Sequence, residues 1–203
     1  MEEGGELVKE LHQPLAIRIY HWVMAVSVAI LTFTGFHLSQ PYAWLTVRMG
    51  FVRKIHYIFG FIVIINLIGH VAYYLITRTY NDIIFRWRDL KDIPSFAKYF
   101  LFLNEPHPNF GKYNPGQRLL FCAWAVALVV GGLAGLATYF PRQAVFVYQI
   151  YGGLQGIKWV KYLTGVFFAA TIPIHLYLVF TEDPAKLQAM FTGYVKKRKK
   201  KDQ

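Results

Sequence analysis

The sequence predicts an all-α integral membrane protein, a four-transmembrane-helix bundle with both termini cytoplasmic and an interfacial helix between helices 2 and 3. The composition is 55% hydrophobic and 18% aromatic, and the mean hydropathy is +0.31, values typical of membrane proteins. Each of four apolar blocks is about as long as the roughly 20 residues that span a bilayer. We therefore expect one membrane domain over residues 1–203, with helices at about 18–38, 54–77, 117–140 and 159–181.

The distribution of basic residues predicts the orientation. With four spans, the N-terminus, the middle loop and the C-terminus share one side and carry 16 of the 22 Lys and Arg, whereas the two opposite loops carry 6. The positive-inside rule then places both termini in the cytoplasm, in a cell (inner) membrane. The basic tail, about 186–203, is expected beside anionic headgroups, so the net charge of +11 indicates membrane lipid and no nucleic acid. Residues 1–10 lack the basic start of a cleavable signal peptide.

The first apolar block, RIYHWVMAVSVAILTFTGFH, contains two histidines. His21 is expected about one turn inside the cytoplasmic edge. His37 follows 16 residues later, about 160° around the helix, and is expected at the outer interface. Pro41 ends the helix, and Tyr42 and Trp44 then form an aromatic belt at the outer surface.

The second apolar block has no acidic or basic side chain after Lys54, yet it holds His56 near its start and His70 near its end. These two are about 21 Å apart along a helix and only about 40° apart around it. An ionisable residue inside a membrane helix indicates function, and neutral imidazole is a common ligand of metals, including haem iron. Two cofactors, or one on each side of the membrane, would suit this pair; the alternative is two interfacial residues bonded to headgroups or water.

The middle loop, about 78–116, includes PSFAKYFLFL, which is too short to span a bilayer. We expect this segment to lie flat in the cytoplasmic interface with Phe96, Phe100 and Phe102 inserted. The turn-rich segment NEPHPNFGKYNPGQR follows, and its His107 is expected to be an exposed loop residue.

The third and fourth blocks add small residues, a proline and a histidine. Gly131, Gly132 and Gly135 permit close helix approach or clearance for a flat macrocycle. Pro173 should kink the fourth helix near His175, which lies close to the cytoplasmic end. The one cysteine, Cys122, excludes an intramolecular disulfide and a cysteine-bound iron–sulfur cluster within this chain. Any iron–sulfur centre would belong to a partner.

Histidines at one depth on different helices could hold one haem. His21, His70 and His175 are expected near the cytoplasmic leaflet and His37 and His56 near the outer one. Two histidines of the cytoplasmic group can face each other from different helices without strain. In the outer group, His37 points in a direction that does not suit pairing with His56.

The order of motifs resembles a known family. RIYHW opening the first helix, VRKIH opening the second and IHLYLVF closing the fourth resemble the cytochrome b membrane subunits of formate dehydrogenases and nickel–iron hydrogenases. GKYNPGQRLLF is similar to the formate dehydrogenase gamma subunit, and GGLQ…FTGYVKK is more similar to the hydrogenase-type relatives. The resemblance covers about residues 12–197.

The resemblance implies haems b stacked across the membrane, the outer one reduced by an iron–sulfur subunit and the inner one passing electrons to menaquinone or ubiquinone. It implies that His21 and His175 ligate the inner haem iron and His56 the outer one. The family's second outer ligand, 14 residues before its last histidine, is Lys161 here. This leaves open one haem only, an unusual sixth ligand, or ligation by His37.

The resemblance also marks three further positions. His70 stands where the family often has a basic residue, so it is an extra ligand or a propionate partner. Asn114 and Gly116 match the family's quinone-site turn, where an amide can bond a quinone and a glycine lets a planar ring approach. Asn114-Pro115 alternatively starts the helix as a cap, and both roles are compatible.

The predicted function is therefore a haem b-containing membrane anchor subunit. It passes electrons between an iron–sulfur partner of an oxidoreductase, of formate dehydrogenase or hydrogenase type, and membrane quinone. A catalytic subunit would carry the substrate chemistry, with no catalytic residue in this chain. The alternatives are a thiosulfate/polysulfide reductase-type cytochrome b subunit, a structural anchor, or a non-haem transporter or proton channel, which would need acidic residues that the four spans lack.

Overall fold

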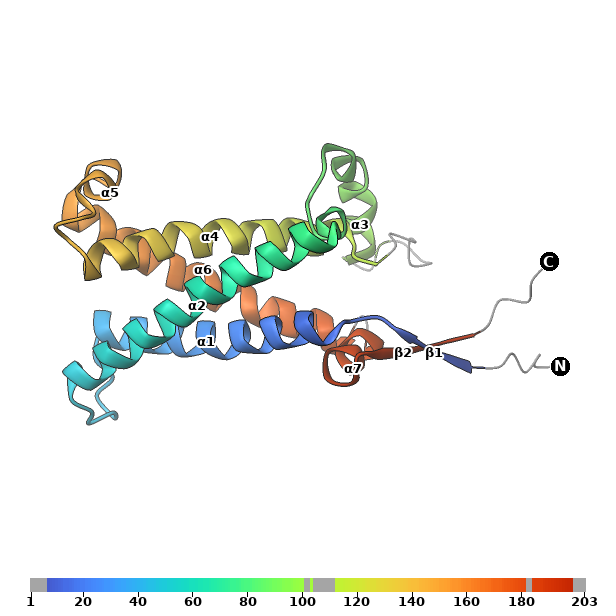
Figure 1. Cartoon of the computed structure of the whole chain (residues 1–203), viewed down its shortest axis with the longest axis horizontal. Coiled ribbons are helices and arrows are strands. Elements are labelled where there is room, and N and C mark those ends of the chain that lie inside the picture. Colours follow the sequence, from blue (N-terminus) through green and yellow to red (C-terminus); the bar gives the residue numbers. More distant parts are fainter. Residues whose placement is uncertain (1–6, 101–102, 104–111, 182–183, 199–203) are drawn as a thin grey trace. The chain divides into compact units, whose positions relative to one another are not determined.

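The structure is a computed structural model that describes residues 7–100, 103, 112–181 and 184–198. Within these ranges it has four helices long and apolar enough to cross a membrane, which confirms the predicted integral membrane protein (Figure 1). Each begins two to six residues earlier than its apolar block. They are α1 (Leu15–Ser39), α2 (Met49–Thr77), α4 (Pro115–Tyr139) and α6 (Gly153–Thr181).

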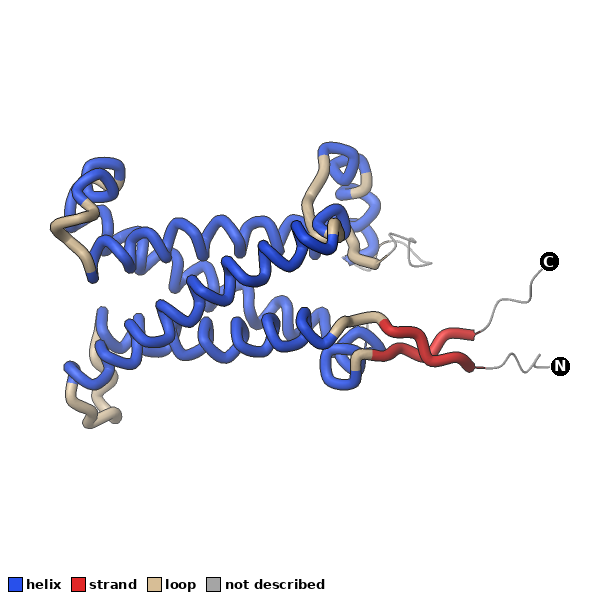
Figure 2. The backbone as a smooth tube through the Cα atoms, viewed as in Figure 1, coloured by secondary structure: helices blue, strands red, loops and turns tan. Residues whose placement is uncertain are grey.

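Shorter elements connect and flank these helices (Figure 2). The helix predicted between the second and third spans is present as α3 (Ile93–Phe100). The predicted all-α class holds for the membrane-length helices, and the sequence did not predict the two short strands. The remaining elements are β1 (Leu7–Leu11), η1 (Tyr80–Asp82), η2 (Trp87–Lys91), α5 (Val145–Ile150), α7 (Pro184–Thr192) and β2 (Tyr194–Arg198).

The chain forms two compact units. The first contains residues 1–59 and 165–203, and the second contains residues 60–164. Helices α2 and α6 each contribute one part to each unit.

In the first unit, the two ends of the chain pair as an antiparallel ribbon, with Leu7 opposite Arg198 and Leu11 opposite Tyr194. Gly193 makes the turn into β2 at φ 89°, a left-handed conformation that favours glycine. Its N–H donates to Ala189 O at 2.8 Å, and its carbonyl accepts from the backbone of His12 and Gln13 at 2.9 and 3.1 Å. The segment predicted as a basic tail thus includes a helix and a strand.

Side chains of α1 hold the end of α7. Arg18 Nε donates to Met190 O at 3.2 Å, its Nη2 donates to Phe191 O, and Trp22 Nε1 also donates to Met190 O, at 3.1 Å. The last carbonyls of a helix have no partner within the helix, so these bonds complete α7. The Trp22 and Phe191 rings pack at 4.8 Å, which fixes α7 beside the α1 turn that carries His21.

In the second unit, Ala134, Ala137 and Ile157 form a fully buried cluster where α4 ends and α6 begins. The Tyr151 hydroxyl donates to Val130 O at 3.0 Å, and burial raises the pKa of this hydroxyl, so it remains a neutral donor. A Cβ on Gly131 would lie 2.8 Å from the Thr164 methyl carbon. Gly131 therefore serves close packing of α4 on α6, one of its two predicted uses.

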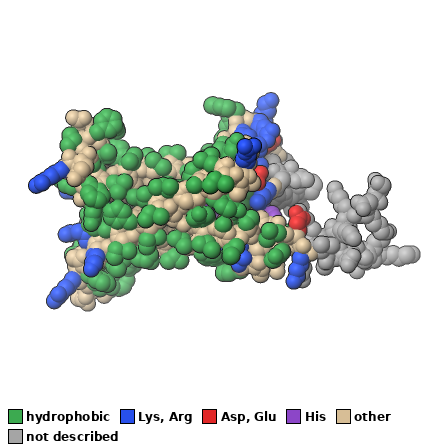
Figure 3. All heavy atoms as spheres, in the orientation of Figure 1, with side chains coloured by type: hydrophobic (Ala, Val, Ile, Leu, Met, Phe, Trp, Pro, Cys, Tyr) green, Lys and Arg blue, Asp and Glu red, His purple; other side chains and the backbone are tan. Residues whose placement is uncertain are grey.

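The long helices expose apolar side chains. Ile65, Ile76 and Val126 are 69%, 81% and 62% exposed, and Figure 3 shows hydrophobic side chains along the helices with Lys and Arg at the helix ends. Such a surface is stable in lipid, where apolar side chains meet hydrocarbon and basic ones reach the headgroups.

Candidate functional site

Two histidines from distant parts of the sequence face each other in the first unit. The His21 ring on α1 and the His175 ring on α6 have centroids 6.4 Å apart and planes inclined by 55°. Two imidazoles on opposite sides of one metal ion, each bonded at about 2 Å, have centroids about 6 Å apart. His21 and His175 would therefore suit the role of the two protein ligands of one haem iron.

The surroundings of this pair are aromatic and apolar. Trp22 meets His21 edge to face at 5.3 Å, and Phe168, about two turns before His175 on α6, is buried. Pro173 lies within α6, which continues through it. His21 and His175 themselves are half-buried.

His56, also in the first unit, is bonded to α1. Its Nδ1 lies 2.8 Å from Thr34 Oγ1, and Thr34 Oγ1 lies 2.6 Å from Ile30 O. Gly35 comes close to the same ring, since a Cβ there would lie 3.4 Å from His56 Cε1. Thr34 and Gly35 thus seat the His56 ring against α1.

His37 has a different role in the same unit. It is 1% exposed, and its Nδ1 accepts a hydrogen bond from Tyr42 N at 3.0 Å. Its Nε2 is buried and has no hydrogen-bond partner within the described part of the chain. His37 stabilises the turn after α1, with the Tyr42 ring 5.0 Å away.

His70 and Lys161 lie in the second unit. The half-buried His70 ring stacks on Tyr74, with centroids 5.0 Å apart and planes 27° apart; it is the unit's one histidine among the described residues. Lys161 Nζ lies 3.5 Å from Thr138 Oγ1. Because the Thr138 hydroxyl donates to Ala134 O at 2.8 Å, its oxygen accepts from Lys161. Within the described ranges there is no group of three His, Cys, Asp or Glu that could hold a metal ion.

The turn before α4 is a helix cap. Asn114 Oδ1 accepts from Gln117 N at 2.7 Å, and Gln117 Oε1 accepts from Asn114 N at 3.1 Å. Together with Pro115 in the first turn, this is a reciprocal capping box. The structure thus bears out the predicted capping role of Asn114-Pro115.

The space beside Gly116 is filled by the Phe96 ring of this chain. A Cβ on Gly116 would lie 2.5 Å from Phe96 Cε1, so α3 packs on α4 through this contact. Phe96 is therefore used in packing within the protein, and its predicted insertion in the interface stays a prediction. Phe102 and His107 lie outside the described residues.

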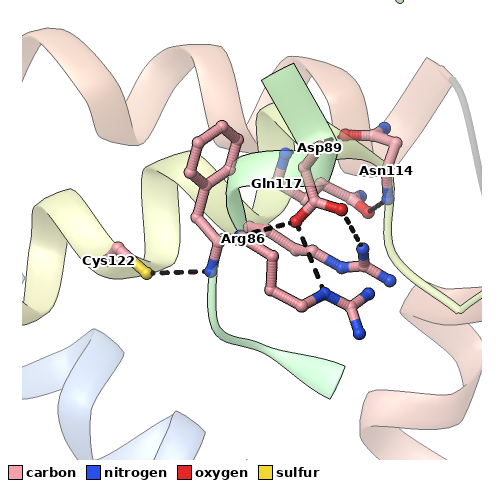
Figure 4. Close-up of polar contacts among 7 residues, drawn as sticks. Arg86, Asp89, Asn114, Gln117 and Cys122 are labelled. Carbon is pink, nitrogen blue, oxygen red and sulfur yellow. Dashed lines mark hydrogen bonds and ion pairs between the residues drawn. The ribbon is translucent and has the colours of Figure 1, made fainter. Parts of the chain in front are cut away.

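The structure also reveals a polar cluster that was not predicted, shown in Figure 4. Asp89 is 2% exposed; its Oδ1 accepts from Arg118 Nη1 at 2.9 Å and its Oδ2 accepts from Arg86 N at 2.8 Å. Nearby, the Phe85 N–H donates to Cys122 Sγ at 3.3 Å. These bonds tie the segment around η2 to α4. Since Asp89 and Arg118 are 29 residues apart in the chain, no local motif indicates their pairing.

Four membrane-length helices and two facing imidazoles are the features of a membrane cytochrome of b type. Residues 12–193 match the family model described as prokaryotic cytochrome b561, and the chain belongs to this family. The family implies haem b, and the match confirms the predicted cytochrome b membrane subunit family.

Individual relatives are similar over most of their length. A probable Ni/Fe-hydrogenase B-type cytochrome subunit of Azotobacter vinelandii is 24% identical over 200 residues, covering 88% of this chain and 83% of the relative. The corresponding protein of Cupriavidus necator is 22% identical over 209 residues, with the same two coverages of 88% and 83%. A probable Ni/Fe-hydrogenase 1 B-type cytochrome subunit of Escherichia coli K12 is 24% identical over 167 residues, covering 73% and 67%.

Proposed function

We propose that this chain is the haem b-carrying membrane anchor subunit of an oxidoreductase of Ni/Fe-hydrogenase type. It passes electrons between an iron–sulfur subunit and a membrane quinone, and a catalytic subunit carries out the substrate chemistry. The observation that carries the proposal is the His21–His175 pair, 6.4 Å apart, in a chain of the cytochrome b561 family. The names of the relatives favour hydrogenase over formate dehydrogenase as the partner enzyme.

His21 and His175 would hold the inner haem. When bound, haem b supplies one-electron redox chemistry at a potential set by its axial ligands, neighbouring hydrogen bonds and burial. The two imidazoles fix its position between α1 and α6, and Trp22 packs against one of them. The apolar side chains of the helices exclude water from this position.

His56 would be a ligand of the outer haem, as the family resemblance implies. Its ring is held against α1 by Thr34 at 2.8 Å, which is the arrangement expected of an oriented metal ligand. At the position of the family's second ligand this chain has Lys161, whose amine is bonded to Thr138. His70, stacked on Tyr74, would be the partner of a haem propionate.

The quinone, menaquinone or ubiquinone, would bind at the first turn of α4. Asn114 Oδ1 accepts from Gln117 N, so the side-chain NH₂ of Asn114 is the group that would donate to a quinone carbonyl. The Phe96 ring fills the space beside Gly116, so a quinone ring would approach this turn from the side of Asn114. The basic asymmetry, 16 to 6, favours a cytoplasmic location for this turn and for both termini.

Residues 1–203 would act as one membrane domain, because α2 and α6 each run through both compact units. The anionic lipid of the cytoplasmic leaflet would be the partner of the basic C-terminal segment.

Electron transfer by the purified chain tests this function. In detergent, the dithionite-reduced protein should show the absorption of low-spin haem b, and a short-chain quinone should reoxidise it rapidly. A protein that carries haem but is reoxidised by quinone no faster than the His21→Ala variant would contradict the quinone-reactive role. A protein without haem would contradict the whole proposal.

A further inference from the structure

The hydrogen bonds of Thr34 determine where its hydroxyl proton lies. The hydroxyl has one proton and two lone pairs. It is 2.6 Å from Ile30 O and 3.3 Å from Leu31 O, and a carbonyl oxygen can only accept. The proton of Thr34 is therefore directed back to the carbonyls of its own helix, the usual arrangement for a threonine within a helix.

This arrangement determines the tautomer of His56. Because the Thr34 proton is already donated, Thr34 Oγ1 must accept at its 2.8 Å contact with His56 Nδ1. The proton of the neutral imidazole is then on Nδ1 and its lone pair is on Nε2. Thr34 is only 7% exposed, so water does not readily replace it in this bond.

The second outer histidine has the opposite tautomer. His37 Nδ1 accepts from Tyr42 N at 3.0 Å, so the lone pair of Nδ1 is occupied and the proton of the neutral ring is on Nε2. An imidazole in this state offers no lone pair to a metal. The hydrogen bonds therefore distinguish two histidines that the sequence places near the same leaflet.

We propose that Thr34 is a positioning residue for a haem b, accepting the Nδ1–H of His56 so that Nε2 is the coordinating nitrogen. We assign His37 to the turn after α1 and exclude it as a ligand. Metal-ligating histidines generally donate their other N–H to an oxygen acceptor, which fixes the ring and makes the ligand more basic. The inference rests on the proposed haem-binding role of His56.

Thr34→Val and Thr34→Ser are the informative variants. Valine keeps the shape of threonine but lacks the acceptor, whereas serine keeps the hydroxyl. Thr34→Val should weaken binding of the His56-dependent haem by roughly 10-fold or more. In the molecules that still bind this haem, its midpoint potential should be more positive, because His56 is then a less basic ligand. Thr34→Ser should retain wild-type haem content and potential. Haem per chain, the reduced spectrum and a redox titration are measured on purified protein.

Thr164→Val and His37→Asn are the controls. Thr164→Val removes a similar hydroxyl, which bonds Val160 O at 2.8 Å, and should leave haem content and potential unchanged. His37→Asn keeps an acceptor for the Tyr42 N–H but cannot ligate iron, and should also leave them unchanged. Loss of the same haem in His37→Asn as in His56→Ala would overturn the exclusion of His37.

His56→Ala separates the inference from the function on which it rests. If His56→Ala loses a haem while Thr34→Val matches the wild type in content, spectrum and potential, the positioning role of Thr34 is overturned and the ligand assignment stands. If His56→Ala keeps the full haem content, the ligand assignment is overturned, and the role of Thr34 with it.

Discussion

Asp89 shows how much of the structure around η2 depends on one buried side chain. It is 2% exposed and accepts from Arg118 Nη1 and from Arg86 N. Two guanidinium groups lie beside this one carboxylate, at 2.9 and 3.8 Å. Its negative charge therefore compensates positive charge that would otherwise be poorly solvated.

We expect Asp89→Asn to destabilise the chain by roughly 3 kcal/mol, because it leaves the largely buried Arg118 without a counter-charge. Thermal unfolding in detergent measures this loss. Asp82→Asn, at an exposed position of η1, is the matched control and should be close to neutral. Equal stability of the two variants would show that the Asp89–Arg118 pair contributes little.

Some residues of the candidate haem sites could be predicted from the sequence and others could not. His21, His56 and His175 stood out as candidates because imidazoles are rare in apolar spans, and their ligand roles stay predictions. Thr34 was not predicted, because a threonine in an apolar helix has no local pattern that indicates a partner on another helix. The tautomers of His37 and His56 likewise depend on bonds to residues on neighbouring segments, which only the fold determines.

At the scale of elements, the first turn of α4 combines a cap with a candidate quinone contact. The capping box joins Asn114 and Gln117, and the Phe96 ring of α3 lies on Gly116. Capping requires only an acceptor at position 114, whereas the proposed quinone contact requires a side-chain donor. The two roles therefore respond differently to substitution.

Asn114→Asp should keep the cap and the haem but slow the oxidation of reduced haem by a quinone analogue, because a carboxylate cannot donate. Asn114→Ala should in addition cost about 1 kcal/mol of stability. Stopped-flow reoxidation together with thermal unfolding measures both effects. Wild-type reoxidation in Asn114→Asp and in Asn114→Ser would remove the quinone role from this turn.

The long elements were predicted better than the short ones. Four spans follow from hydropathy, since length and apolarity alone decide that a segment can cross a bilayer. The β1–β2 ribbon pairs segments far apart in the sequence, Leu7 with Arg198, and its second strand mixes strand-forming Tyr and Val with lysines that disfavour a sheet. Such distant pairing, like the capping of α7 by Arg18 and Trp22, has no local sequence signal.

At the scale of the whole molecule, the order and spacing of motifs identified the family, and the match over residues 12–193 confirms it. The spans keep a length that can cross a bilayer at 24% identity to a relative. Lys161 at the position where the resemblance implies a histidine is visible in the sequence. The bond between its amine and Thr138 Oγ1 is not visible there, because Thr138 lies on another helix.

The orientation of the chain in the membrane is predicted from the distribution of its basic residues. Because 16 of the 22 basic residues lie on the side of the termini, we expect the C-terminus in the cytoplasm. A reporter fused after Gln203 that is active only outside the cytoplasm should stay silent, and a cytoplasmic reporter at the same position should be active. The reverse pair of signals would invert the assignment of both sides.

The haem content of the His21 and His175 variants shows whether these two residues hold one haem together. The two rings lie 6.4 Å apart on separate helices, so each should be needed for the same haem. We expect His21→Ala, His175→Ala and the double variant to insert in the membrane at wild-type levels and to lose the same low-spin haem b, with no further loss in the double variant. Full wild-type haem content in both single variants would contradict the account.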